Sequence, residues 1–71
     1  MKYYVVHIQT TNDGTVKSIF EYDTKNQALI EYHQNIAYDM SSDIIQDSIV
    51  LVLNQGGGTV LSNHFERNST I

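Results

Sequence analysis

Three histidines, His7, His33 and His64, are the side chains of this sequence best suited to metal binding or to acid–base chemistry near neutral pH. No two of them are four residues apart, and no His-Glu-x-x-His pattern occurs, so their spacing predicts no metal site. The chain has no cysteine, which excludes thiolate metal ligands. We expect His33 near the edge of a helix's apolar stripe, as a boundary residue with local hydrogen bonds, and His7 and His64 as surface residues or as part of a binding rim.

The run Gly56-Gly57-Gly58 could present backbone N–H groups to a phosphate. It stands between two predicted strands and lacks the lysine and hydroxyl of a P-loop, so we interpret it as a hairpin turn. No serine stands in a nucleophile elbow, and no pair of carboxylates has a spacing typical of acid–base catalysis. We therefore expect a protein that is not an enzyme and that has no cofactor.

Four segments have the alternation and the β-branched and aromatic content that are typical of strands. They cover residues 2–10, 15–22, 47–54 and 59–67. The third contains five consecutive aliphatic residues, a run too short to span a membrane and typical of a strand covered on both faces. The rest of the chain is expected to pack around this strand.

The loop between the first two strands sets their register, because a shift of one residue reverses every side chain. A two-residue loop over residues 13–14 would place the Glu21 carboxylate in the core. A three-residue loop adds residue 12, pairs Val6 with Phe20 and gives Gly14 a positive φ, which glycine adopts readily. We predict the three-residue loop.

Thr24 and Gln27 form a capping box that predicts the start of a helix, which extends to about residue 40. Its apolar stripe consists of Leu29, Tyr32, Ile36 and Met40. A right-handed crossover then places the third strand beside the first. The predicted fold is α+β: a ββαββ domain over residues 1–71 with an antiparallel sheet of order 2-1-3-4, one helix on one face, and residues 68–71 as a frayed tail.

One helix can cover only one face of this sheet. We expect it to cover Tyr4, Val6, Ile8, Phe20, Ile49, Leu51 and Leu53. The other face then carries an apolar patch, which usually marks an interface or a ligand surface, although a half-exposed sheet with a few surface valines is the alternative. The predicted ligand or partner surface comprises Tyr3, Val5, His7, Gln9, Lys17, Ile19, Val50, Val52, Ser62 and His64.

Size and charge limit the possible partners. The core of a 71-residue chain contributes only about 3–5 kcal/mol to the stability of the fold. Because the chain has no disulfides, we expect oligomerisation to reinforce it, most simply as a homodimer packed sheet on sheet. The net charge is −4 and the four cations are scattered, which argues against duplex nucleic acid and membrane surfaces. No secretion signal or membrane span is evident, so we expect a cytoplasmic location and read the Asn68-Ser69-Thr70 glycosylation sequon as a polar tail.

Several short motifs carry a resemblance that covers nearly the whole chain. They are Met1-Lys2-Tyr3-Tyr4-Val5-Val6, Asn12-Asp13-Gly14, Glu21-Tyr22-Asp23-Thr24, Tyr32-His33, Ala37-Tyr38-Asp39-Met40 and the aliphatic strand at 49–53. With these, the sequence resembles small ββαββ accessory proteins encoded by phages and prophages of Gram-positive bacteria. The resemblance implies an interaction or sequestering protein that counters host defences in the host cytoplasm, and some such proteins trap nucleotide second messengers as small oligomers.

The sequence therefore supports two alternative functions. The first is a homo-oligomer that sequesters a small nucleotide-derived ligand, with the five tyrosines available for stacking. The second is an interaction protein that docks on a host or phage protein through the uncovered sheet face. The small number of Lys and Arg residues counts against a highly anionic ligand.

Overall fold

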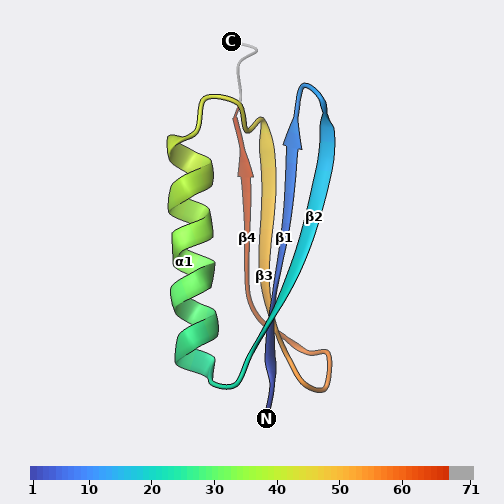
Figure 1. The fold of residues 1–71 in the computed structure, drawn as a ribbon, viewed down its shortest axis with the longest axis vertical. Coiled ribbons are helices and arrows are strands. Elements are labelled where there is room, and N and C mark those ends of the chain that lie inside the picture. The colour runs from blue at the N-terminus through green and yellow to red at the C-terminus, as the bar shows by residue number, and fades with distance from the viewer. Residues whose placement is uncertain (68–71) are drawn as a thin grey trace.

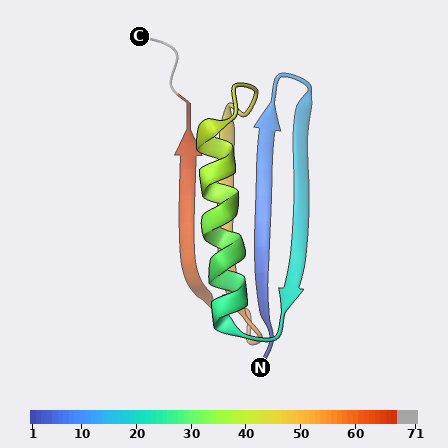
Figure 2. The ribbon, with the colours of Figure 1, turned by 60° about the vertical axis from the view of Figure 1, so that its left-hand side comes forward.

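The computed structural model describes residues 1–67. It consists of β1 (Tyr3–Thr11), β2 (Gly14–Tyr22), α1 (Lys25–Ser41), β3 (Asp47–Asn54) and β4 (Thr59–Glu66). All neighbouring strands are antiparallel, their order is β2-β1-β3-β4, and α1 runs along one face of the sheet (Figures 1 and 2). The predicted ββαββ fold and strand order are confirmed, whereas the expected frayed tail and sequon lie outside the described residues.

The helix packs on the face of the sheet, here called the covered face, that carries Val5, Val50 and Val52. These three side chains are fully buried and form one cluster with Ala28 and Tyr32 of α1. Successive side chains of a strand point to opposite faces. The neighbouring residues of β1 and β3 therefore lie on the other face, the open face, and the predicted assignment of these two strands is wrong.

The reason for this error is that both faces of the central strands are apolar. The open face carries Ile49, Leu51 and Leu53, which are larger and more apolar than the valines that alternate with them. Hydrophobicity alone would place the larger set under the helix. The structure places the smaller set there, because the helix contributes a polar group of its own that needs partners on the sheet.

The β1–β2 hairpin has a shorter loop than predicted. Residues 12–13 form the loop, and Gly14 is the first residue of β2, with a φ of 133° that only glycine adopts without strain. Val6 consequently pairs with Ile19 and not with Phe20. The three-residue loop was expected in order to keep Glu21 out of the core, but this face of the hairpin points away from the helix, so no carboxylate is buried by the observed register.

The helix begins as its sequence predicts. The Thr24 hydroxyl caps it by accepting a hydrogen bond from the Gln27 N–H at 3.2 Å. The stripe that faces the sheet, however, passes through Tyr32 to Asp39, while Met40 is 58% exposed. Met40 is therefore wrongly assigned to the buried stripe, because an apolar residue at helical spacing was preferred to the acidic residue beside it.

The turn of the β3–β4 hairpin is held by the side chain of Asn54, the last residue of β3. The Asn54 side-chain oxygen Oδ1 accepts hydrogen bonds from the N–H groups of Gly56 and Gly58, both at 3.0 Å, and the Gly57 N–H bonds to the Asn54 carbonyl. A register shift after this turn leaves Val60 as an extra residue that packs against the core. Because its N–H groups are used internally, the glycine run is a hairpin turn and not a phosphate cradle.

Candidate functional site

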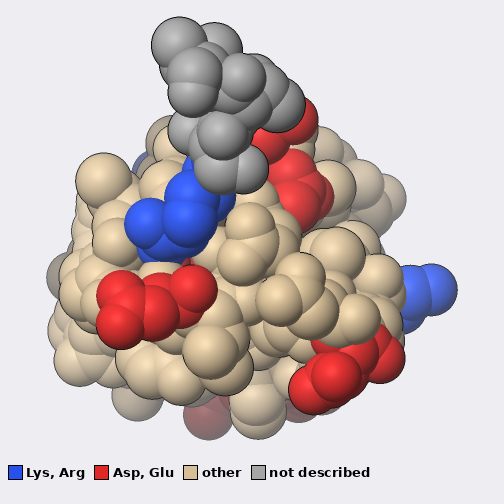
Figure 3. All heavy atoms as spheres, turned by 90° about the horizontal axis from the view of Figure 1, so that it is seen from above, with Lys and Arg blue, Asp and Glu red and all other residues tan. Residues whose placement is uncertain are grey.

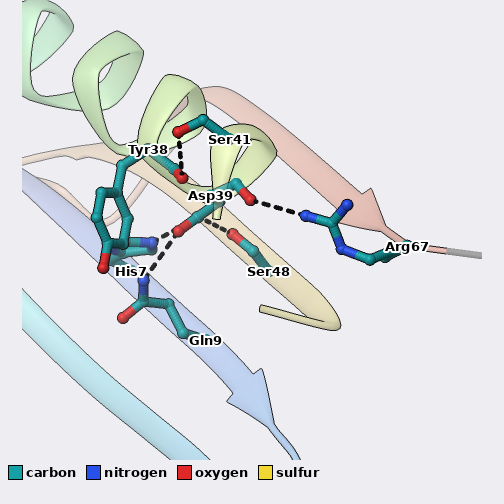
Figure 4. Close-up of polar contacts among 7 residues, drawn as sticks. All are labelled: His7, Gln9, Tyr38, Asp39, Ser41, Ser48 and Arg67. Carbon is teal, nitrogen blue, oxygen red and sulfur yellow. Dashed lines mark hydrogen bonds and ion pairs between the residues drawn. The ribbon is translucent and has the colours of Figure 1, made fainter. Parts of the chain in front are cut away.

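A cluster of polar side chains lies buried between the last turns of α1 and the central strands (Figure 4). Asp39 is fully buried, and its Oδ2 atom lies 2.7 Å from His7 Nε2 and accepts a hydrogen bond from the Ser48 hydroxyl. Its Oδ1 atom accepts a hydrogen bond from Gln9 Nε2 at 2.8 Å. A carboxylate tolerates burial only when its oxygens are paired or hydrogen-bonded. These three donors from β1 and β3 therefore hold the end of α1 on the sheet.

The same three residue types occur in hydrolytic triads, but the arrangement here differs. In a triad the histidine bonds to the serine and the carboxylate orients the histidine. Here His7 and Ser48 both contact the same oxygen of Asp39. Ser48 is 1% exposed, and residues 1–67 form no pocket beside it. The cluster therefore presents no nucleophile to a substrate, and its role in this fold is to position α1.

Arg67 closes the C-terminal end of α1 next to this cluster. Its guanidinium donates to the carbonyls of Asp39, Ser42 and Ile45, and its side chain lies over the Phe65 ring, with 5.1 Å between the guanidinium carbon and the ring centroid. The last carbonyls of a helix lack partners within the helix and attract cations. This cation thereby connects the end of β4 with the helix and with the connector to β3.

The structure divides the residues of the predicted ligand or partner surface between the two faces of the sheet. Tyr3, Val5, His7, Gln9, Val50 and Val52 lie on the covered face, where the helix packs. Lys17, Ile19, Ser62 and His64 lie together on the open face, as predicted. The sheet does have an apolar face that the helix does not cover, but the residues at its centre differ from the predicted ones.

The open face is a nearly regular grid, because the strands pair without a shift except between β3 and β4 at Val52 and Leu53. Ile8 lies opposite Ile49, Val6 opposite Leu51, and Tyr4 opposite Leu53. The apolar centre of this face, here called the apolar patch, consists of Tyr4, Val6, Ile8, Ile19, Ile49, Leu51 and Leu53. Six of these side chains are partly exposed, and Ile19 is 69% exposed. Nothing within residues 1–67 packs on this patch (Figure 1).

Polar residues surround the apolar patch. They are Lys17 and Glu21 on β2, Ser62, His64 and Glu66 on β4, and, in the row across the end of the sheet, Thr10, Thr15 and Asp47. His64 Nε2 lies 2.6 Å from Asp47 Oδ1. An apolar centre with a polar rim is the usual anatomy of a protein interface.

Lys2 forms a small ionic network at the β2 side of this face. Its ammonium lies 3.4 Å from Glu21 Oε2 and contacts Asp23. The hydrogen bond to Asp23, followed by that to Glu21, raises the pKa of Lys2, and the same contact lowers the pKa of Asp23. Both groups are exposed to solvent, so the network is expected to influence the charge of the rim more than the stability of the fold.

Charges elsewhere on the surface are mixed. Seen along the long axis, acidic and basic side chains alternate over this end of the molecule without forming a patch of one sign (Figure 3). Residues 1–67 contain no group of three or more side chains able to hold a metal ion together. His33 is exposed on α1, where its ring meets Tyr32 edge-on at 5.0 Å. The open face is therefore the best candidate for a functional surface.

Sequence reasoning missed the role of Asp39 because its partners are distant in the chain. His7 and Gln9 precede it by 32 and 30 residues. One local signal existed: His7, Gln9 and Ser48 all belong to the same alternating sets as Val5, Val50 and Val52. Three polar residues gathered on one face indicate that this face meets a polar partner and not a purely apolar helix.

Comparison with known proteins returned no matching family model, no matching curated protein and no matching solved structure. Residues 1–67 contain no helix that combines the length and the apolar character needed to cross a membrane. The function must accordingly be inferred from the geometry of the chain itself.

Proposed function

We propose that this protein is a non-enzymatic binding protein whose working surface is the open face of the sheet. The observation that supports this most directly is the apolar patch, seven large side chains on a face that no described part of the chain covers. Contiguous apolar surfaces of this kind are rare on proteins that act alone and usually mark interaction sites.

The lack of a pocket in residues 1–67 favours a protein partner over a small ligand. A small nucleotide-like ligand is usually held in a concave site that surrounds most of its surface. Residues 1–67 form no such pocket, so a ligand site would have to be created between subunits. An apolar surface with a polar rim and no pocket instead fits the surface of another protein, which can come from a second copy or from a different protein.

A capture experiment with one pair of matched variants tests this function. Ile19→Glu places a charge on the open face, and Val16→Glu places the same charge on the other face of the same strand, where Val16 is 58% exposed. Tagged wild-type and variant chains are incubated with untagged wild-type chain and with cell lysate, and the bound proteins are quantified by mass spectrometry.

We expect a protein, either the untagged copy or another chain, to bind the wild type and Val16→Glu in stoichiometric amounts and to be lost with Ile19→Glu. Far-UV circular dichroism of both variants verifies that the fold is intact. Equal capture by Ile19→Glu and Val16→Glu, or capture of no protein by any of the chains, would contradict the proposed function.

A further inference from the structure

We propose that the partner of the open face is a second copy of this chain, packed sheet on sheet about a two-fold axis parallel to the strands. This inference rests on the proposed function, because it identifies the partner of the same surface. It assigns β2 of one copy to lie over β4 of the other, and β1 to lie over β3.

The size of the face fits such a pairing. Four strands about 4.8 Å apart and four rows about 6.7 Å apart give roughly 500 Å² in projection, so two faces together reach about the 1,000 Å² that a specific interface needs. Two antiparallel sheets commonly pack face to face at about 10 Å with nearly aligned strands. A chain of this size also gains from burying more apolar surface than its own core provides.

The order of the rows selects this axis. An axis parallel to the strands keeps each row at its own level, so that Ile8 meets Ile49 of the second copy and Val6 meets Leu51 of the second copy. The polar end row then meets its own counterpart, with Thr10 over Asp47. A two-fold axis perpendicular to the strands would reverse the rows and press Asp47 against the apolar Leu53, which would bury a carboxylate against a hydrocarbon surface.

The charges of the rim are self-complementary in the same arrangement. Lys17 stands on the β2 side, in the row of Ile8, Ile49 and His64. Glu66 stands on the β4 side, one row nearer the end of the sheet. The axis parallel to the strands brings Lys17 over the β4 rim of the second copy, within about one row spacing, roughly 7 Å along the strand, of Glu66. The flexible four-carbon stem of lysine can cover such an offset.

The open face carries charges of both signs, with more acids than cations, within a chain whose net charge is −4. Lys2 and Lys17 stand on this side of the molecule with Glu21, Asp23, Asp47 and Glu66. Because cations and acids both occur on this face, they can form ion pairs between two copies in an orientation that brings opposite charges together.

Sedimentation equilibrium of the wild type, Lys17→Glu, Glu66→Lys and the double variant tests the arrangement. Each single change places like charges together at two symmetric contacts, and we expect it to raise the dimer dissociation constant roughly tenfold, with recovery in the double variant. Glu66→Lys is especially informative, because it lowers the net negative charge and would strengthen the dimer if only overall repulsion mattered. Lys25→Glu, an exposed residue at the start of α1, changes the net charge as Lys17→Glu does and serves as the control.

The outcomes separate this inference from the proposed function. A dimer that Lys17→Glu and Glu66→Lys weaken and that their combination restores supports the arrangement. A dimer that none of these changes affects more than Lys25→Glu overturns the arrangement, while the function stands if Ile19→Glu still dissociates it. A monomer that captures a different protein through Ile19 contradicts the second copy as partner but leaves the proposed binding function intact. A monomer that captures no protein contradicts both the dimer and the binding function.

Discussion

Asp39 decides which face of the sheet the helix covers. Both faces of β1 and β3 could bury apolar surface, but only one carries His7, Gln9 and Ser48, which together donate to the carboxylate. Placing the other face under the helix would separate the Asp39 oxygens from these three donors, and a buried carboxylate that loses its donors costs several kcal/mol. A single buried acid therefore outweighs the greater hydrophobicity of the face that remains open.

Replacing this acid should destabilise the protein severely. Asp39→Asn removes the charge and one acceptor oxygen and leaves a buried donor unpaired, so we expect the free energy of unfolding to fall by about 2–3 kcal/mol. Because a core of this size supplies only about 3–5 kcal/mol, the variant should be largely unfolded in moderate urea. Urea titration followed by circular dichroism measures the change.

Asp43→Asn is the matched control, since Asp43 is an exposed acid shortly after the end of α1. We expect it to alter the unfolding free energy by no more than about 0.5 kcal/mol. Equal effects of the two substitutions would show that the cluster around Asp39 does not hold the helix on the sheet.

The ionic network of Lys2 should produce a small pH dependence on the acid side. The contact with Lys2 lowers the pKa of Asp23 from its ordinary value of 3.8, so its contribution to stability is present above that value and is lost as the pH falls through the lowered pKa of the folded state. We expect Asp23→Asn to flatten the stability curve in this acidic range. Urea midpoints measured across that range, at low and at high salt, verify the effect, and an unchanged slope in the variant would contradict it.

Local sequence signals predicted the helix and the four strands correctly. The capping residues Thr24 and Gln27 fixed the start of α1, and alternation fixed the positions of the four strands. The register of the first hairpin could not be fixed in this way, because it depended on which face of β1 the helix covers. That choice involves Asp39, a residue of a later element, so the wrong face led directly to the wrong loop.

Gly14 should be required for this hairpin. Its φ of 133° is unfavourable for any residue with a Cβ, although no atom lies within 4 Å of the position that a Cβ would take. Gly14→Ala should therefore lower the unfolding free energy by about 1–2 kcal/mol through backbone strain alone. Gly56→Ala is a suitable comparison, since Gly56 has no positive φ and a Cβ there would make an ordinary 3.5 Å contact with Asn54. Equal urea midpoints for the two variants would contradict this account of the turn.

The two-layer fold, one sheet and one helix, leaves an apolar face of the sheet without a covering layer within residues 1–67. In the part of the chain that the structure describes, a single helix covers one face of an elongated sheet, and the molecule measures 43 × 19 × 16 Å. The sequence predicted an uncovered apolar face, and from it a partner. It placed Lys17, Ile19, Ser62 and His64 on that face correctly. It assigned the wrong central residues, because hydrophobicity cannot distinguish two faces that are both apolar.

Self-association should make the stability depend on protein concentration. If the folded chain pairs through its open face and the unfolded chain does not, dilution favours unfolding by mass action. We expect the thermal midpoint of the wild type to rise with concentration and that of Ile19→Glu to stay constant. Differential scanning fluorimetry over a concentration series tests this, with Val16→Glu as the variant that should behave like the wild type.

The mass of the unmodified protein in solution decides whether two copies of the chain pair. Sedimentation equilibrium over the micromolar range should give a mass approaching twice the 8.1 kDa of one chain as the concentration rises, and Ile19→Glu should give the mass of one chain throughout. A wild-type protein that sediments as a single 8.1 kDa chain at every concentration would contradict the assignment of the open face as the interface between two copies.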